Sequence, residues 1–336
     1  MGFLGFRWLV NFGLLALPIG VTLGILLGLD ASRQASGGAP LFTGDPTTPG
    51  STPNNNGITA MVSCDKAMGL HPLSKGQEYT LNPNQWGWTE GTDGALCMNV
   101  TTFNNQTYAT DFSAPEFWVT WRYPRGPETQ PVHAFPNIKV DGTVLPLEIS
   151  KISKIAVDVE WSYAVGNYTT DGDSATTTDE TALTENDTNT NVAIDMFLDD
   201  DKTSAQNSTL AAYEVMVWLA TFGSATQPIG YKSGSGALTT KAINGTTFTL
   251  YGGQNSLKQY VLTWVAPTTE HFVGDLSELV TTLTSLPASV TALATDVKFP
   301  TSATYLGYMG LGSEALSATK VVTFRVPTLS IDIASS

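Results

Sequence analysis

The sequence has 336 residues, of which 42% are apolar and only 14% are charged, enough for one large domain or two ordinary ones with a sizeable core. The net charge is −14, from 16 basic and 30 acidic residues, and no cluster of Lys and Arg occurs along the chain. The composition therefore excludes the basic surface that a nucleic-acid partner needs, and no nucleic-acid partner is expected.

The N-terminal segment from Trp8 to Leu29 carries no charge and is long enough to span a bilayer. Arg7 precedes it, which favours a cytoplasmic N-terminus. Residues 1–29 are therefore predicted to be a signal peptide or an uncleaved signal-anchor helix, with membrane anchoring through residues 8–29 in the second case. In both cases we expect an extracellular protein, either secreted or anchored at the cell surface.

Residues 30–57 are rich in Pro, Gly, Ser, Thr and Asn. This composition buries too little apolar surface to fold, and it predicts a flexible linker. From residue 58 onward, short alternating segments separated by turn residues predict one folded domain, residues 58–336. Six Asn-x-Ser/Thr sequons agree with export. They begin at Asn99, Asn105, Asn167, Asn186, Asn207 and Asn244.

Alternation of apolar and polar residues predicts that this domain is an antiparallel β-sandwich. The clearest strand patterns are at residues 117–123, 155–163, 213–219, 246–252, 259–265 and 321–326. Residues 169–191 are acidic and Thr-rich without an apolar period, which predicts a mobile surface insertion.

One segment has the period of a helix. Its apolar residues share one face at helical spacing. They are Leu276, Leu279, Val280, Leu283 and Leu286. Asp275 and Glu278 resemble a capping box at its start, and Pro287 ends it. We therefore expect a single helix laid on the outside of the β-structure.

The chain contains two cysteines, Cys64 and Cys97. In an exported chain they predict one disulfide, which closes a loop of about thirty residues and stabilises the fold by about 3–4 kcal/mol on the chain-entropy model. With three His residues and no Cys-x-x-Cys motif, no metal site is expected.

The strand pattern at residues 213–219 places Glu214, Met216 and Trp218 on one face, opposite a core-forming face. A carboxylate beside an aromatic platform suits a site that cleaves sugars. Pyranose rings stack on aromatic rings, and the anomeric carbon needs an anion. The alternative is a half-buried Glu with ordinary packing neighbours.

A second carboxylate, Glu314, follows three glycines, Gly307, Gly310 and Gly312. Glycine within a strand often marks a bulge or the close approach of a ligand. Retaining glycosidases need two carboxyls about 5–5.5 Å apart, one to attack the anomeric carbon and one to protonate the leaving oxygen. We expect Glu214 and Glu314 to form such a pair on a curved sheet, where repulsion and partial burial keep one of them protonated near neutral pH.

Asp195 is a candidate third acid. It can lie beside Glu214 and tune the charge of that carboxyl through a shared proton. The alternative is that Asp195 caps a strand end or accepts a hydrogen bond.

Taken in order, several segments resemble glycoside hydrolase family 12, the small endoglucanases and xyloglucanases. The matching segments, besides the two cysteines, are YTLNPNQWG (79–87), FWVTWRYPRG (117–126), AFPNI (134–138), NVAIDMF (191–197), YEVMVWL (213–219), PIG (228–230) and GSEAL (312–316). The E-x-M-x-W strand and the late G-[ST]-E are the most specific of these matches.

The resemblance implies a jelly-roll sandwich of two antiparallel sheets with a concave substrate cleft, one external helix and retention of anomeric configuration. It places the nucleophile on Glu214, the acid/base on Glu314 and the acid that contacts the nucleophile on Asp195. It also implies that residues 58–336 are the catalytic domain.

The same resemblance supplies the expected substrate-binding residues. Asn84 and Trp86 fall at the non-reducing side of the cleft, with Trp86 as a stacking platform. Met216 and Trp218 line the floor near the reaction, and Cys64 pairs with Cys97.

Two stretches depart from the family pattern. Residues Ala315-Leu316-Ser317 follow Glu314 where a Phe-Thr-Gly-like run is usual, and Gly310 stands where a Gln is often found. The contacts on the leaving-group side are therefore expected to differ.

The predicted function is endo-acting, retaining hydrolysis of β-1,4-glucosidic bonds in cellulose-type or mixed-linkage β-glucan, by a monomer without metal or organic cofactor. A xyloglucan-specific endo-β-1,4-glucanase is the closest alternative, because loop shape decides whether the cleft admits xylosyl branches. A non-catalytic glucan-binding module is the alternative of another class. Loss of one carboxylate would mark such a module, and both are present here. A xylanase of a related jelly-roll family is disfavoured by the Asp195 segment and the E-x-M-x-W strand.

Overall fold

The computed structural model describes residues 58–103, 108–168, 176–224, 226–232 and 236–336. The predicted membrane segment at residues 8–29 and the linker at residues 30–57 lie outside this part of the chain. Contacts group Gly57–Ser336 into one unit. Among the helices in the described ranges, none has the length and apolar character needed to cross a membrane.

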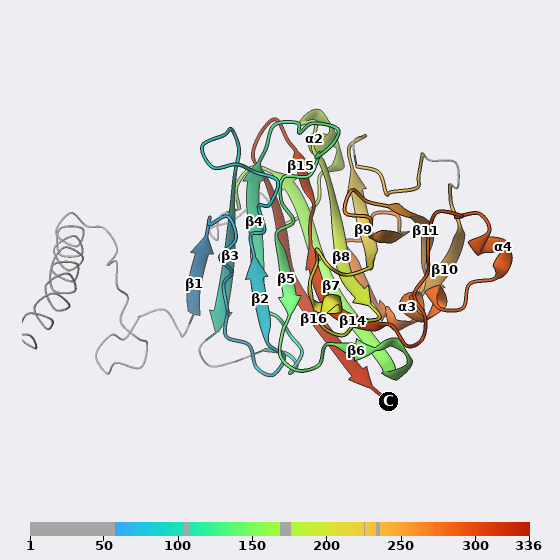
Figure 1. Cartoon of the computed structure of the whole chain (residues 1–336). Helices are drawn as coiled ribbons and strands as arrows, with labels where there is room; N and C mark the ends of the chain where they lie inside the picture. Colours follow the sequence, from blue (N-terminus) through green and yellow to red (C-terminus); the bar gives the residue numbers. More distant parts are fainter. Residues whose placement is uncertain (1–57, 104–107, 169–175, 225, 233–235) are drawn as a thin grey trace, which may run out of the picture. The chain divides into compact units, whose positions relative to one another are not determined.

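Strands dominate the described residues and form two sheets (Figure 1). The first is six-stranded. Its strands, in spatial order, are β1 (Ile58–Ser63), β3 (Ala95–Phe103), β4 (Glu116–Arg122), β16 (Val322–Ser335), β7 (Ile152–Val165) and β13 (His271–Asp275). Strands β4, β7 and β16 lie where the sequence pattern predicts strands, with ends that differ by a few residues except at the longer C-terminal end of β16.

The second sheet is ten-stranded and carries the candidate site. Its main path is β10 (Thr239–Ile243), β11 (Thr246–Gln254), β12 (Tyr260–Val265), β9 (Tyr213–Phe222), β8 (Asn189–Asp199), β14 (Tyr305–Gly312), β5 (Asn137–Val140) and β2 (Tyr79–Asn82). Two short strands complete it: β15 (Ala315–Ser317) pairs with β8, and β6 (Leu147–Glu148) pairs with β14.

One pairing in this sheet departs from the predicted antiparallel arrangement. Strands β9 and β12 are parallel, whereas the other strand pairs among the described residues are antiparallel. The hairpin of β10 and β11 lies between them in the chain, so β12 returns beside β9 in the same direction. The sequence could not predict a parallel neighbour for β9, because the alternation of apolar residues is the same in parallel and antiparallel strands.

The main core is one cluster of buried side chains from the inward faces of both sheets. On β9 it takes Val215, Val217 and Leu219, and on β7 it takes Val157 and Val159, all buried. Aligned packing of two such faces is the β-sandwich arrangement. Each buried Val or Leu contributes about 1.5–3 kcal/mol, so truncating Val217 to Ala would destabilise the fold without touching the opposite face of β9.

The predicted helix is confirmed as α3 (Ser277–Leu283), with Leu279, Val280 and Leu283 buried. Its predicted capping box is wrong. The Asp275 carboxylate accepts from the backbone N–H groups of Ser277 and Ile155, which ties the helix start to β7. The Glu278 side chain turns away and pairs with Lys241 at 3.0 Å. Two further short helices occur, α2 (Glu180–Glu185) and α4 (Ala288–Thr291), alongside the 3₁₀ turns η1 (Ile149–Lys151) and η2 (Ser204–Gln206).

The prediction of a surface insertion at residues 169–191 is confirmed for residues 176–185, which are mostly exposed, and is wrong for residues 189–191. Helix α2 occupies this stretch, and the buried residues Asn189, Thr190 and Asn191 begin strand β8. Asn186 is also buried, and its amide is bonded to Thr188, Thr319 and Lys320. A glycan on that sequon is incompatible with the fold. Buried amides and hydroxyls replace apolar side chains here, so no hydrophobic period marks the strand.

The predicted disulfide between Cys64 and Cys97 is present. It joins the segment after β1 to strand β3 across a sequence separation of 33 residues. Next to it, the buried Gln85 donates to the backbone carbonyls of Cys64 and Asp65. The disulfide and Gln85 together fasten the loop that carries Asn84 and Trp86.

Candidate active site

The face of the ten-stranded sheet that points away from the core is called the site face below. Strand β9 places Glu214, Met216 and Trp218 on it, because the alternate residues of the strand belong to the core. The neighbouring strand β8 sets Asp195 directly opposite Met216. On the other side of β8, β14 sets Gly310 opposite Asp195. The sequence alternation thus predicted the shared face of Glu214, Met216 and Trp218 correctly.

Glu314 reaches this group from the turn between β14 and β15. Its backbone N–H donates to the side-chain oxygen of Asn191 at 2.8 Å, and the Asn191 amide N–H donates back to its carboxylate. The hydroxyl of Thr190 donates to the Glu314 carbonyl at 2.7 Å. Three bonds from the start of β8 therefore fix both the backbone and the carboxyl of Glu314.

The residue before Glu314 is anchored in the core. The hydroxyl of Ser313 is buried and contacts the hydroxyls of Thr190 and Tyr163. Tyr163 in turn accepts a hydrogen bond from the indole N–H of Trp121 at 2.6 Å. This polar chain runs through the sandwich and holds the β14–β15 turn, so the position of Glu314 is set by buried groups.

Glu214 has a different support. The side-chain N–H of Asn255 donates to its Oε2 at 3.2 Å. The same amide donates to Gln259 at 2.8 Å, and its oxygen accepts from the backbone N–H of Gln259 and Leu257. Gln259 is buried and donates to the carbonyl of Ala211, just before β9. Asn255 is thus oriented on both sides before it meets Glu214.

The three carboxyls perturb one another. Burial raises the pKa of Glu214 from 4.5 to about 7, against the hydrogen bond from Asn255, which lowers it. Burial first and the charge of Glu214 second raise the pKa of Glu314 from 4.5 to about 7, while the bond from Asn191 lowers it. Because the ionised Glu214 raises the pKa of Glu314, the pair favours one carboxylate and one carboxylic acid near neutral pH.

Asp195 is the most buried of the three, at 4% exposure. Burial, then the charge of Glu214, then that of Glu314 raise its pKa well above the usual value. Its Oδ1 has no hydrogen-bond partner among the described residues. A buried, unpartnered carboxylate is costly, so Asp195 is held in the protonated form beside the other two acids.

An apolar cluster covers the rest of the site face near Glu214. It joins Met216 and Trp218 to Phe135 and Ala193, with Val265 packed against them. This cluster is separate from the main core. Its apolar side chains disfavour the charged form of a nearby carboxyl, and this desolvation is the largest cause of the raised pKa values of the acids.

Asn84 and Trp86 lie in the loop after β2. The carbonyl of Asn84 accepts from the backbone N–H of Phe135, a member of the apolar cluster. Between the two residues, Gln85 is buried and accepts from the hydroxyl of Tyr123 at 2.6 Å. Trp86 itself is 53% exposed. Hydrogen bonds of Asn84 and Gln85 therefore hold the loop in place, and the Trp86 indole is exposed to solvent.

Two site residues escaped the sequence analysis, namely Asn191 and Asn255. Asn191 lies in the segment NVAIDMF, four residues before Asp195, so its place on the same strand face as Asp195 was readable. Asn255 lies in a turn between β11 and β12. No local pattern signals its contact with Glu214, which depends on the parallel pairing of β12 with β9.

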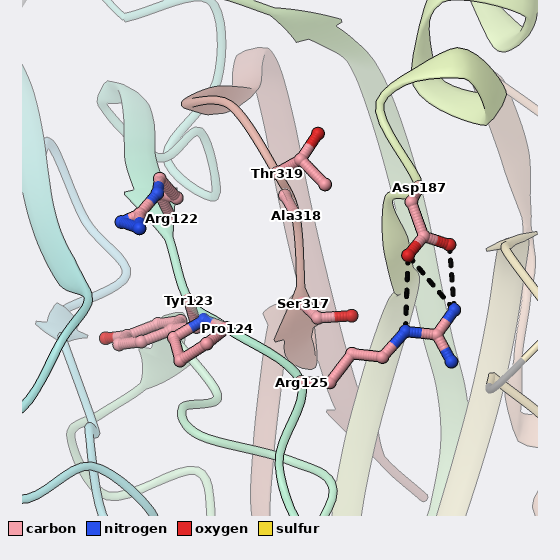
Figure 2. Close-up of a pocket in the computed structure, with 8 residues that line it drawn as sticks. All are labelled: Arg122, Tyr123, Pro124, Arg125, Asp187, Ser317, Ala318 and Thr319. Carbon is pink, nitrogen blue, oxygen red and sulfur yellow. Dashed lines mark hydrogen bonds and ion pairs between the residues drawn. The ribbon is translucent and has the colours of Figure 1, made fainter.

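A cavity of about 250 Å³ lies close to the segment that follows Glu314. Figure 2 shows its lining, where the Arg125 guanidinium faces the Asp187 carboxylate and Ser317 and Thr319 lie nearby. Arg125 donates to both oxygens of Asp187, and this lowers the pKa of the Asp187 carboxyl. The pair is exposed to solvent, so it adds little to the stability of the fold. It ties the segment after β4 to the segment that leads into β8 and Asn191.

Two acids that repel each other beside an indole, on the open face of a sheet, weaken the fold. Hydrolysis of a glycosidic bond needs such a pair, with one member protonated and the other ionised. The β-sandwich and the coupled acids together define a glycoside hydrolase.

The particular family follows from comparison with known proteins. The model of glycosyl hydrolase family 12 matches residues 77–334, and the chain belongs to this family. A probable xyloglucan-specific endo-β-1,4-glucanase A of Aspergillus clavatus is 33% identical over 206 residues, which cover 60% of this chain and 69% of that protein. An inactive glycoside hydrolase, XLP1, of Phytophthora nicotianae is 28% identical over 217 residues, covering 64% of this chain and 75% of that protein.

The fold is shared with solved structures of the family. The crystal structure of endoglucanase 3 of Trichoderma harzianum superposes with a TM-score of 0.58 at 20% identity, covering 84% of this chain and all of that one (100%). The likeness confirms the predicted sandwich of two sheets.

Proposed function

We propose that the protein is an endo-acting, retaining β-1,4-glucanase in which Glu214 is the nucleophile and Glu314 is the general acid/base. The observation that carries this proposal is the electrostatic coupling of the two half-buried carboxyls on one face of the sheet. Its direction, with the charge of Glu214 raising the pKa of Glu314, matches the roles that the sequence suggested.

In the first step, protonated Glu314 gives its proton to the glycosidic oxygen while the Glu214 carboxylate attacks the anomeric carbon. The bond to the leaving sugar breaks, and a glycosyl ester forms on Glu214. Charge on Glu214 is then gone, which lowers the pKa of Glu314 and favours its ionised form. Glu314 next takes a proton from water, and the resulting hydroxide displaces the ester with net retention.

Asp195 supports the nucleophile in this scheme. As a buried carboxylic acid, it can donate its proton to the Glu214 carboxylate and stabilise that charge. This hydrogen bond makes the Glu214 carboxylate a weaker nucleophile, and it breaks as the glycosyl ester forms. Its role is therefore to tune Glu214, as the sequence analysis expected.

The substrate-binding roles follow the same scheme. Exposed Trp86 and neighbouring Asn84 hold the non-reducing part of the chain, and Met216 and Trp218 form the floor under the reacting sugar. The exposure of Trp86 and the membership of Met216 and Trp218 in the site-face cluster support these roles.

The polymer is a β-1,4-linked glucan, either unbranched or mixed-linkage, with xyloglucan as the second candidate. The xyloglucan-specific name of the Aspergillus relative favours the second candidate. A parallel assay of reducing ends on carboxymethylcellulose, barley β-glucan, xyloglucan and xylan separates them. Release from xylan alone would overturn the glucanase proposal.

A non-catalytic, glucan-binding role is the rival from another class, and the inactive relative in Phytophthora gives it weight. The presence of both carboxyls and of a dedicated amide for each one favours catalysis. Glu214→Gln should abolish turnover and keep glucan binding within about twofold, because the amide retains shape and loses only the nucleophilic charge. Undiminished turnover by this variant would remove Glu214 from the chemistry.

We further propose that the enzyme acts outside the cytoplasm, secreted or held by residues 8–29. The uncharged N-terminal segment, the sequons and the disulfide support this location. Blotting of cell and medium fractions from an expressing cell, before and after carbonate extraction, tells the secreted form from the anchored form. Recovery in the cytosolic fraction would contradict both.

A further inference from the structure

A pair of tyrosines on the ten-stranded sheet has no part in the catalytic group. Tyr231 is 49% exposed, and its ring centroid lies 5.6 Å from that of Tyr251, with the ring planes at 54°. Tyr231 belongs to the short segment after β9 that begins with Pro228, and Tyr251 belongs to β11. Contiguous exposed apolar surface, rather than a single exposed side chain, marks sites that contact a partner or ligand.

The register of the sheet places Tyr251 on the site face. Tyr251 pairs with Thr263 on β12, and Thr263 pairs with Met216 on β9. Its neighbours on β11, Phe248 and Leu250, belong to the main core, so Tyr251 points to the opposite side. Two strand spacings, about 10 Å, separate it from the strand of the nucleophile.

The segment that carries Tyr231 is pressed onto β11. Gly230 has φ +92°, and a Cβ on it would lie only 2.2 Å from the carbonyl oxygen of Gly252. The absent side chain of Gly253 leaves room for Ile229, since a Cβ there would lie 2.4 Å from Ile229 Cγ2. The backbone N–H of Tyr231 donates to the carbonyl of Pro228. Tyr231 is thus held in place by close backbone packing.

We propose that Tyr231 and Tyr251 form a sugar-stacking platform for the leaving-group side of a bound β-1,4-glucan chain. This inference rests on the proposed function of Glu214 and Glu314. Trp86 follows β2, at one edge of the ten-stranded sheet, and Tyr251 lies on β11 near the other edge, with Tyr231 in contact with it. Glu214 on β9 and Glu314, in the turn after β14, lie between them in the strand order. With the non-reducing part of the chain on Trp86, the sugars beyond the scissile bond reach the tyrosines.

The chemistry of the two rings fits a glucosyl unit. The C–H groups on one face of a β-glucopyranose are apolar and cover an aromatic ring, while a phenol can bond the hydroxyls at the rim. Binding of sugars remote from the cleaved bond orients the substrate and favours long chains over short ones. The platform therefore contributes to endo-action on polymers.

The test compares Tyr231→Ala with Tyr231→Phe, and uses Phe112→Ala as a matched loss of an exposed aromatic ring in the loop before β4. Cellohexaose occupies both sides of the cleaved bond. β-Cellobiosyl fluoride places no sugar on the leaving-group side. For cellohexaose, Tyr231→Ala should lower kcat/KM about tenfold, equal to about 1.4 kcal/mol, whereas Tyr231→Phe and Phe112→Ala should stay within about twofold. For the fluoride, all three variants should match the wild type.

An equal loss on the fluoride and on cellohexaose would overturn the platform, as would a Tyr231→Ala variant with wild-type kcat/KM on cellohexaose. Binding of cellohexaose by calorimetry, in the Glu214→Gln background with and without Tyr231→Ala, tests the platform without turnover. A tenfold weaker Kd on loss of the ring supports it, and an unchanged Kd refutes it. Failure of the wild type to hydrolyse the fluoride would instead count against the catalytic roles of Glu214 and Glu314.

Discussion

Replacement of Glu314 by Gln separates proton transfer from binding. The amide keeps the size of the carboxyl, and its oxygen can still accept the hydrogen bond that Asn191 donates to Glu314. The backbone anchors of Glu314, from Thr190 and Asn191, do not involve the altered group. The variant should therefore fold and bind glucan while lacking the proton for the leaving oxygen.

The structure sets the size of the effect. The rise of the Glu314 pKa from 4.5 to about 7 corresponds to about 3 kcal/mol in favour of the protonated form. General acid catalysis contributes about 10²- to 10⁴-fold. We expect kcat/KM on cellohexaose to fall by about that factor, and kcat/KM on β-cellobiosyl fluoride to fall less than about tenfold, because fluoride departs without a proton.

The pH profile supplies an independent measure. In the wild type, kcat/KM should fall as pH rises through about 7, where Glu314 loses its proton. The variant should lack this basic limb on the fluoride substrate. Added azide should restore turnover of the fluoride and release β-cellobiosyl azide, since azide attacks the glycosyl ester without a base. Equal losses on both substrates, with the basic limb retained, would show that another group donates the proton.

Three further changes probe the supports of the site. Asn255→Ala removes the donor that lowers the pKa of Glu214. The acidic limb of the kcat/KM profile should therefore move to higher pH, and kcat/KM should fall about tenfold or more. An acidic limb at the wild-type pH would contradict the role of Asn255. Trp86→Ala should weaken binding of long oligomers more than short ones by calorimetry, and equal weakening would make Trp86 merely structural. Because Glu214 and Glu314 have pKa values raised from 4.5 to about 7 in the folded state, the stability that they contribute below pH 4.5 is lost as pH rises through about 7. Calorimetric Tm should fall over that range, and less steeply in Glu214→Gln; a flat wild-type Tm would contradict the coupling.

The sequence predicted those parts of the fold that depend on apolar periodicity. The pattern at residues 213–219 identified both the core face and the site face of β9, and helix α3 was found from the helical spacing of apolar residues between 276 and 286. Strand β8 was not among the predicted strands, and its first residues were assigned to a surface insertion. These residues are polar and pair with hydroxyls and amides distant in the chain. No local pattern reports a hydrogen-bond partner more than a hundred residues away.

In the candidate site, too, the residues with a local sequence signal were predicted and those without one were missed. Glu214, Asp195 and Glu314 were identified from strand alternation, a glycine-rich turn and family resemblance, and the structure brings them within electrostatic reach of one another. Asn255 was missed, because its contact with Glu214 depends on the parallel neighbour of β9. The position of Tyr231 depends on the packing of Gly230 against Gly252, which no strand pattern contains.

The two asparagines differ in a way that fits the different tasks proposed for the two acids. Asn191 bonds both the carboxyl and the backbone N–H of Glu314, so the acid/base keeps its position whether it is protonated or ionised. Asn255 bonds only the carboxyl of Glu214 and is itself held by its own turn and by Gln259. The single bond at 3.2 Å stabilises the charge of Glu214 and leaves its other oxygen free of this amide. In the proposed mechanism, the group that changes protonation twice per cycle is thus held at both its backbone and its carboxyl, whereas the group that forms the covalent bond is held by one hydrogen bond from Asn255.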